Sequence, residues 1–247
     1  MILERPRSYL RGRLTTVHLF CFQLCYSGRR FVRAYRTERQ ETFFEGLARA
    51  LRAVGRVPKR LTFDNPKTLV KKVFRGHLRE EHPNFIAFRS HYLFEGNFCN
   101  PGKGNEKGHV EGLVGCARRN ALVPIPEVVA TLSELNCILE QWGQSDQARM
   151  YKAERVLDRF EAERVHLKPL PAFDYPCCRR EESAVGSYSE VRVGTTVPVA
   201  YAHRSVSVLA YPERVEVLCQ GEVIARHGPE PGYPRPLPLH SAACLYP

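Results

Sequence analysis

Two carboxylates and a glycine-rich basic loop are the residues of this chain whose types and spacing could do chemistry. Asp64 directly follows an apolar run that ends at Phe63, and Glu111 lies three residues after the loop formed by residues 101–108. Carboxylate oxygens are ligands that Mg²⁺ prefers, and the lysines and asparagine of the loop can bind phosphate and sugar oxygens. The combination predicts metal-dependent chemistry on a phosphate backbone.

Asp64 has two interpretations on local sequence. It ends a predicted strand of an α/β domain, and ligand sites in such folds collect at the carboxyl ends of strands. Asp64 and Asn65 before Pro66 are also typical of an Asx turn. The local sequence leaves both interpretations open.

Glu111 lies in the first turn of a helix predicted over residues 108–120. The helix dipole favours a carboxylate at this position, and Glu111 lies beside the apolar stripe of the helix rather than opposite it. A solvated first-turn glutamate is the competing interpretation, and Glu106 in the preceding loop is a rival acid.

A basic stretch after Asp64 and the loop before Glu111 supply side chains that can meet phosphates. Such contacts position nucleic acid without reading its sequence. The predicted DNA-binding residues are Lys67, Lys71, Lys72, Lys103, Asn105, Lys107, Arg118 and Arg119.

The composition agrees with a polyanionic partner. The 247 residues carry a formal net charge of +11, with a sequence pI of about 9.4. A basic balance of this size favours nucleic acid, and an ordinary basic globular protein is the alternative.

The sequence predicts a cytoplasmic protein without membrane contact. No apolar run approaches the roughly 18–20 residues needed to cross a bilayer, and residues 1–13 lack the apolar core of a signal peptide. The nine cysteines include no C-x-x-C pair. We interpret His18, Cys21 and Cys25 as buried packing, because a strand places residues 21 and 25 on one face and residue 18 on the other.

Alternating strands and helices must position these groups. The spacing of apolar residues and the positions of turn-forming residues predict strands at residues 16–26, 30–35, 60–63 and 93–99. Helices are predicted at 37–54 with Thr37 as the N-cap, and at 83–92, 108–120 and 131–142. This alternation indicates a layered α/β core.

The character of the chain changes near residue 169. We predict a core over residues 1–168, with an incomplete first strand and trailing helices, and a linker over 169–186. Short strands at 188–193, 197–201, 205–209, 214–219 and 222–225 predict a small β-barrel over 187–227. The proline-rich residues 228–247 are predicted to be a disordered tail.

Three separated segments resemble the IstA-type transposases of bacterial insertion sequences, which belong to the retroviral-integrase superfamily. In order, they are H-L-F-C-F-Q-L-C-Y-S-G-R-R-F-V-R-A-Y, L-T-F-D-N-P-K-T and F-C-N-P-G-K-G-N-E-K-G-H-V-E. The resemblance covers about residues 15–226, and Y-S-E-V-R-V with the strands after it resembles the C-terminal β-barrel of the family. It implies a ribonuclease-H-like integrase core followed by that barrel.

The resemblance also implies a polynucleotidyl transferase whose three acidic residues hold two divalent ions, Mg²⁺ or Mn²⁺. Asp64 matches the second acidic position and Glu111 the third, whereas Glu106 matches a motif residue that is not a metal ligand. The implied partners are DNA, as transposon ends and target, further copies of the chain in a homo-oligomer, and an ATPase helper protein.

The first acidic position of the family has no match. No aspartate precedes Asp64, and Glu4 is the only acid in residues 1–14. The helix-turn-helix region of the family also has no match, so we expect a chain that is truncated at its start. Two ions are expected only with a full acidic triad.

Three functions follow from this pattern. The first is a DNA transposase that is catalytically impaired. The second is a non-catalytic DNA-binding module derived from a transposase. The third is a ribonuclease-H-type nuclease that uses Glu4 or a carboxylate from a partner.

Overall fold

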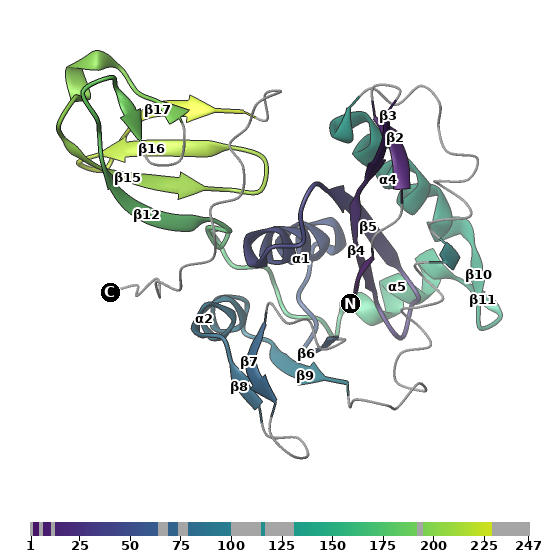
Figure 1. Cartoon of the computed structure of the whole chain (residues 1–247). Helices are drawn as coiled ribbons and strands as arrows, with labels where there is room; N and C mark the ends of the chain where they lie inside the picture. The colour runs from purple at the N-terminus through teal and green to yellow at the C-terminus, as the bar shows by residue number, and fades with distance from the viewer. Residues whose placement is uncertain are drawn as a thin grey trace. The chain divides into compact units, whose positions relative to one another are not determined.

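The computed structural model describes residues 2–4, 7–10, 13–63, 69–73, 79–99, 115–116, 131–191 and 195–228. The chain divides into two compact units, which we call unit 1 (Met1–Tyr175) and unit 2 (Pro176–Pro247) (Figure 1). The division falls inside the predicted linker, and each unit is described by itself.

The main sheet of unit 1 is antiparallel and has the order β1-β4-β5. Its strands are β1 (Ile2–Glu4), β4 (His18–Gln23) and β5 (Arg30–Tyr35). The predicted buried strand is confirmed in β4, where the four residues from Leu19 to Phe22 are all buried. Because both faces of this strand are apolar, other elements must cover it on both sides.

Helix α1 (Gln40–Val54) covers one face of this sheet. The ring of Phe43 meets that of Phe20 at 5.5 Å between centroids. A Cβ at Gly46 would come within 2.6 Å of the Phe20 ring, so glycine allows the helix to approach the strand closely. The predicted N-cap was wrong, because Arg39 and not Thr37 occupies that position. The predicted end is confirmed by Gly55, with φ of 75°.

Helix α4 (Leu132–Ser145) covers the opposite face. Residues alternate between faces along a strand, so the neighbours of Phe20 point to α4. Leucines of α4 pack there in one buried cluster with Val17, Leu19, Cys21, Val32 and Ala34. Thr131 caps the helix by accepting a hydrogen bond from Glu134 N. The Asn136 side chain is buried and bonds both backbone groups of Ala34, at 2.7 and 3.0 Å.

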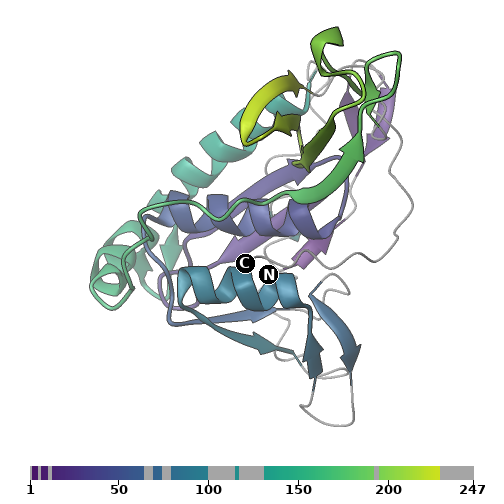
Figure 2. The same cartoon turned by 90° about the vertical axis from the view of Figure 1, so that its left-hand side faces the viewer.

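A parallel strand pair forms the second part of unit 1. It consists of β6 (Arg60–Phe63) and β9 (Glu95–Phe98), which are joined through α2 (Pro83–Tyr92). Helices α1 and α2 lie side by side in both views (Figures 1 and 2). The Phe44 and Phe88 rings stack between them at 4.8 Å.

Two hairpins complete the first part of the chain. They are β2 (Arg7–Leu10) with β3 (Arg13–Thr16), and β7 (Val70–Val73) with β8 (Arg79–Glu81). The sequence predicted none of these four strands. Polar and basic residues interrupt the alternation in each of them, so no strand period is visible.

The last part of unit 1 begins with the 3₁₀ turn η1 (Asp146–Ala148). It continues through β10 (Met150–Tyr151), β11 (Glu154–Arg155) and α5 (Val156–Arg164). The chain then lies on unit 1 up to Tyr175: Lys168 and Val57 exchange two backbone hydrogen bonds, and Asp174 pairs with Arg52. The first part of the predicted linker is therefore ordered on the core.

Unit 2 is a β unit with a four-stranded antiparallel sheet in the order β12-β15-β16-β17. The strands are β12 (Arg179–Ala184), β15 (Ser205–Ala210), β16 (Val215–Cys219) and β17 (Glu222–His227). A two-stranded ribbon joins β13 (Glu190–Val191) to β14 (Thr195–Thr196). Over the described residues of unit 2 the sheet is open, with β12 and β17 at its edges.

Two expectations for unit 2 need correction. The strand predicted at 197–201 is instead the 3₁₀ turn η2 (Val199–Tyr201), which follows Pro198; proline has no N–H to donate to a strand ladder. The second half of the predicted linker contains β12. The predicted disordered tail lies outside the described residues, apart from Gly228.

Candidate functional site

The carboxyl ends of β6 and β9 meet at one edge of the parallel pair. Phe63 and Phe98 are the last residues of the two strands and are register partners. Cys99 N donates a hydrogen bond to Phe63 O at 2.9 Å, which extends the pairing by one residue. Asp64 follows Phe63, and the glycine-rich loop follows Cys99. Both segments therefore leave the sheet from the same edge, where ligands bind in open α/β sheets.

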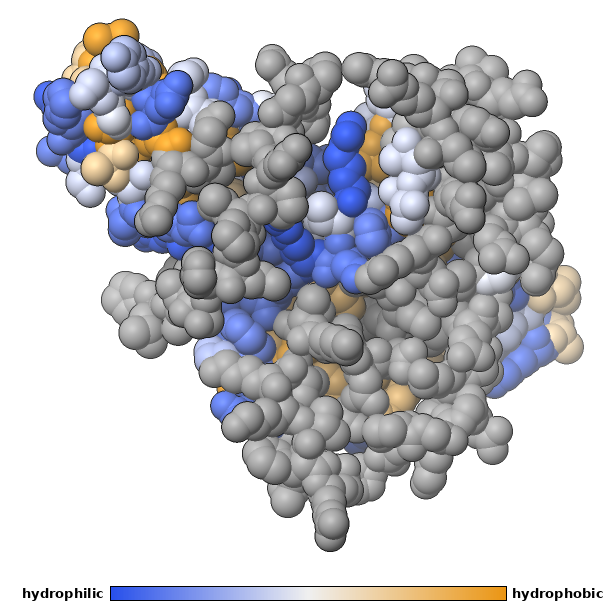
Figure 3. All heavy atoms as spheres, in the orientation of Figure 1, coloured by the Kyte–Doolittle hydropathy of each residue, from blue (hydrophilic) through white to orange (hydrophobic). Residues whose placement is uncertain are grey.

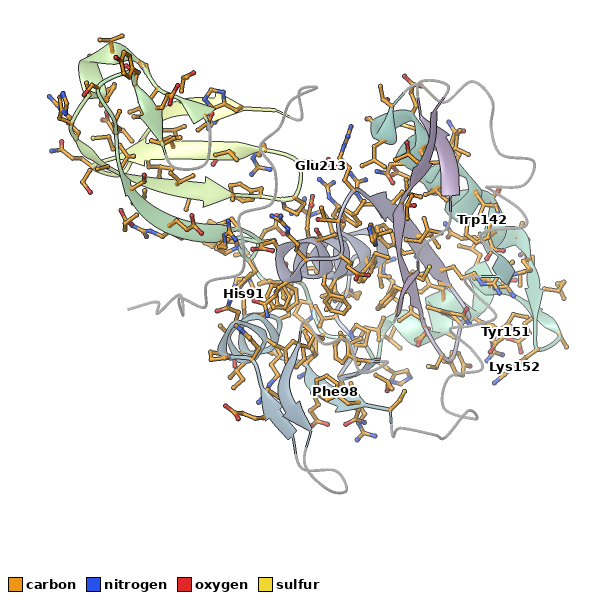
Figure 4. All side chains as sticks on the ribbon, viewed as in Figure 1. His91, Phe98, Trp142, Tyr151, Lys152 and Glu213 are labelled. Carbon is orange, nitrogen blue, oxygen red and sulfur yellow. The ribbon has the colours of Figure 1, made fainter. Side chains whose placement is uncertain are left out.

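Buried aromatic rings hold this edge. Phe63 is fully buried, and its ring lies between 5.2 and 6.2 Å from those of Phe85, Phe98 and Phe94. Figure 4 labels Phe98 at the end of β9. Rings in such edge-on and tilted arrangements add to the stabilisation from buried area. The backbone immediately before Asp64 thus has a rigid support.

Most of the predicted site residues lie outside the described residues. They are Asp64, Glu111, Lys67, Lys103, Asn105, Lys107, Arg118 and Arg119. Lys71 and Lys72 are in strand β7, for which the backbone alone is described. Gly115 and Cys116 are helical, in the segment predicted to be a helix. Over the described part of the chain, no three His, Cys, Asp or Glu side chains form a cluster that could hold a metal ion.

The positive charge of the chain belongs to unit 1. Residues 1–175 contain 30 basic and 19 acidic residues, which give a formal net charge of +11. Residues 176–247 contain seven of each and are formally neutral. All eight predicted DNA-binding residues lie in unit 1. An electrostatic attraction for a polyanion would therefore act on unit 1.

Sequence reasoning missed Arg30, which lies at the start of β5. Its guanidinium contacts Cys116 in the helical segment 115–116 and Asp146 in η1. These partners are 86 and 116 residues away along the chain. No local signal could have identified them, because the contact depends on the tertiary fold.

Sequence comparison identifies relatives over most of the chain. It is 33% identical over 224 residues to a transposase of Aminobacter aminovorans, covering 88% of this chain and 43% of the relative. It is 31% identical over 226 residues to the transposase for insertion sequences IS1326/IS1353 of Pseudomonas aeruginosa, covering 88% and 44%. A 28% match to the IS21 transposase of the same species covers 87% and 57%. The chain spans about half the length of these curated relatives.

Two further comparisons concern parts of the fold. Residues 170–230 match the family described as "Mu transposase, C-terminal domain". A chain of the simian T-cell lymphotropic virus intasome, solved in complex with PP2A regulatory subunit B56 gamma, superposes with a TM-score of 0.50 at 11% identity. The superposition covers 90% of this chain and 73% of that one.

These matches agree with the described geometry. Unit 1 is a mixed α/β unit, and the fold of the chain resembles that of the superposed intasome chain. Among the described residues, no helix is long and apolar enough to cross a bilayer. The chain is thus related by descent to the insertion-sequence transposases of the IS1326 and IS21 type.

Proposed function

We propose that unit 1 is a ribonuclease-H-like core of a DNA transposase, built for metal-dependent phosphoryl transfer in transposition and integration. The observation that carries the proposal is the shared edge of β6 and β9. It brings the start of the Asp64 segment beside the start of the glycine-rich loop, at the end of the sheet where this class of fold binds ligands.

Asp64 and Glu111 are the residues that we assign to metal binding. Their carboxylates fit Mg²⁺ or Mn²⁺, which are hard ions that prefer oxygen ligands. When bound in pairs, such ions activate the attacking oxygen and stabilise the leaving oxygen in an in-line displacement. The buried rings around Phe63 would hold Asp64 in place, and the loop lysines would hold DNA phosphates near both carboxylates.

Of the three carboxylates that the family resemblance implies, these 247 residues supply matches for two, Asp64 and Glu111. Without a third carboxylate, the core would be catalytically impaired. The loss of one ligand weakens the site for the ions and should lower the rate by several orders of magnitude. Glu4 is the only acid in residues 1–14; it lies on β1, opposite Leu19 of β4.

A non-catalytic DNA-binding module is the second candidate function. The concentration of basic residues in unit 1 favours it, because these residues could bind DNA without cleavage. Binding would then depend strongly on salt, since phosphate contacts release counterions.

We infer that unit 2 is the small C-terminal β-barrel of such a transposase. His227 Nε2, at the end of β17, lies 2.8 Å from the carbonyl oxygen of Thr196 in β14. Val191 and Val197, from the β13–β14 ribbon, share one buried core with Val208 and Val217 of the sheet. Both observations support closure of the sheet by the ribbon.

The partners are proposed by relationship. DNA, as transposon ends and target, is the expected substrate. A homo-oligomer and an ATPase helper are expected in the reaction. The relationship to transposases supports the first of these expectations.

One assay tests the proposed function. The full chain is incubated with Mg²⁺ or Mn²⁺ and DNA that carries a transposon end, beside the variants Asp64→Asn, Glu111→Gln and Glu4→Gln. Cleavage that is lost in the first two variants and retained in Glu4→Gln supports the enzyme. Salt-sensitive DNA binding without cleavage supports the module. If the chain binds no DNA at low salt, both proposals fail.

A further inference from the structure

Residues 168–175, which we call the strap, lie on helices α1 and α2 of unit 1. At the start of the strap, Lys168 and Val57 exchange two backbone hydrogen bonds, of 2.8 and 2.9 Å. The Lys168 ammonium also donates to the carbonyl oxygen of Leu93, the C-cap residue of α2. The start of the strap therefore joins the segment after α1 to the end of α2.

The other end of the strap is held by a ring and by a carbonyl group. The Tyr175 ring lies 5.1 Å from that of Phe88 in α2 and 6.1 Å from that of Phe44 in α1, between centroids. The Phe173 carbonyl oxygen lies 2.8 Å from Nε2 of His91 in α2 (Figure 4). Both ends of the strap thus contact the same pair of helices.

These contacts are numerous, but they are close to solvent. The structure describes all of residues 168–175, and none of them is buried. Arg52 of α1 pairs with Asp174, but the two side chains are 59% and 54% exposed, so the pair contributes little. Phe173 is 81% exposed. A segment with solvent-exposed hydrogen bonds and few buried apolar contacts opens locally while the core stays folded.

Little free chain joins the two units while the strap is docked. Tyr175 is the last residue of unit 1, and the Cys178 side chain hydrogen-bonds Tyr211 of unit 2. Between these two anchors the sequence has Pro176 and Cys177. Release of the strap would extend the free chain to residues 168–177, whose root-mean-square end-to-end distance as a flexible coil is roughly 17 Å.

We propose that the strap is a releasable latch that sets the length of free chain between the two units. When docked, it limits this link to Pro176 and Cys177, and when released it lengthens the link without unfolding the core of unit 1. A shorter link raises the effective concentration of one unit at a ligand that the other unit holds. The latch thus regulates joint binding by the two units, and it does not depend on the proposed metal site.

The test uses the full chain and measures opening of the strap by chymotrypsin, for which the exposed Phe173 is a cleavage site. Mass spectrometry identifies the new end at Asp174. Such cleavage follows the population of the open form when opening and closing are fast. The variants are Lys168→Met and Tyr175→Ala, and Tyr188→Ala in unit 2 is the matched control, because Tyr188 is 89% exposed. Cleavage of the urea-unfolded chains corrects for the effect of each substitution on the protease itself.

We expect cleavage after Phe173 to become roughly 10-fold faster in Lys168→Met and Tyr175→Ala, and to stay at the wild-type rate in Tyr188→Ala. Hydrogen exchange in peptides that cover residues 168–175 should accelerate to the same extent, while peptides of β4 keep their wild-type rates. Small-angle X-ray scattering at equal molar mass should give a larger radius of gyration for the two strap variants.

Three results would overturn the latch. Exchange that accelerates equally in β4 and in the strap would make the strap an integral part of the core. Wild-type cleavage and exchange in both strap variants would show that Lys168 and Tyr175 do not hold it. Faster cleavage with an unchanged radius of gyration would show that release does not lengthen the link.

Discussion

The two units differ in their balance of charge. In unit 2, four arginines pair with glutamates on the same strand or its neighbour: Arg179 with Glu181, Arg180 with Glu182, and Arg214 and Arg226 with Glu216. Unit 1 carries the whole excess of basic residues. Exposed hydrophobic residues do not distinguish the units, because they reach the surface of both (Figure 3): Phe173 of unit 1 is 81% exposed and Val199 of unit 2 is 77% exposed. If the proposed DNA binding holds, this difference in charge predicts that the salt-dependent part of the affinity resides in unit 1.

The largest expected effect tests whether the two units unfold separately. Phe63→Ala empties the aromatic cluster and should lower the free energy of unfolding of unit 1 by about 3–5 kcal/mol. The matched change Val217→Ala in the core of unit 2 should cost about 2 kcal/mol there. Trp142 is the only tryptophan, and it packs against the buried cluster under α4 (Figure 4).

Urea unfolding followed by Trp142 fluorescence therefore reports unit 1, whereas circular dichroism reports both units. Phe63→Ala should shift the fluorescence midpoint, and Val217→Ala should shift only part of the circular dichroism transition. A shift of the Trp142 midpoint in Val217→Ala would show that the units unfold together, and the comparison would lose its basis.

The next effect concerns charge. The double variant Lys71→Glu and Lys72→Glu should weaken DNA binding roughly 10-fold near 0.1 M salt, and it should reduce the salt slope by about 2. Arg180→Glu with Arg226→Glu is the matched change in unit 2, at side chains 62% and 70% exposed. Fluorescence anisotropy of a labelled duplex over several salt concentrations measures both. Equal losses in the two double variants would contradict the assignment of DNA affinity to unit 1.

A smaller effect contrasts two tight turns. Lys152 and Ala153 join β10 to β11 with φ of 53° and 68°, and Gln220 and Gly221 join β16 to β17 with φ of 52° and 88°. A side chain in the left-handed region costs roughly 1–2 kcal/mol, which glycine avoids at some cost in entropy. Ala153→Gly should stabilise unit 1 by about 0.5 kcal/mol, as measured by urea unfolding.

Gly221→Ala is the reverse change in unit 2 and should destabilise it by about 1 kcal/mol. A Cβ at Gly221 meets no atom within 4 Å, so the backbone conformation alone would cause the loss. If both variants change stability in the same direction, turn strain does not distinguish the two hairpins.

The last effect appears only at alkaline pH and is confined to unit 2. Burial, with smaller contributions from Cys178 and Glu216, raises the pKa of Tyr211 to about 12. A raised pKa means that the folded state retains the proton while the unfolded state has lost it. The resulting stabilisation is complete below about pH 10 and is lost as the pH rises toward 12.

Tyr211→Phe should therefore reduce the loss of stability between pH 9 and pH 11, measured by thermal unfolding with circular dichroism. Tyr188→Phe is the control, since the Tyr188 side chain is 89% exposed. The Trp142 transition of unit 1 should be the same in the wild type and both variants at each pH. An identical alkaline loss in Tyr211→Phe and the wild type would exclude Tyr211 as its source.

The sequence was informative where apolar residues dominate a segment. The apolar run predicts strand β4, and the helical spacing of apolar residues predicts α1. Helix α4 begins after Thr131, which caps it. The sequence did not predict strand β12, because its residues R-R-E-E-S-A form no apolar face. It also failed in α5, where Val156 and Phe160 form one short stripe and Arg159 is buried against Tyr26 O, which accepts two of its hydrogen bonds. In both elements, tertiary contacts outweigh local preference.

The candidate site divides in the same way. The strand that precedes Asp64 could be predicted from its alternation and from Pro66. The strand pairing that places the end of β9 beside it could not be predicted, because parallel strands are far apart in the sequence and only the tertiary fold brings them together. Arg30 is the extreme case, since it contacts two partners that are more than 80 residues away along the chain.

The Asn136 side chain has a consequence for solubility. Among the described strands, β5 is at the edge of its sheet, and a free edge offers N–H and C=O groups to strands of other molecules. By bonding both groups of Ala34, Asn136 occupies the point at which a foreign strand would begin to pair. This single amide thus satisfies both backbone groups of Ala34 and makes this point of the edge unavailable to edge-to-edge pairing.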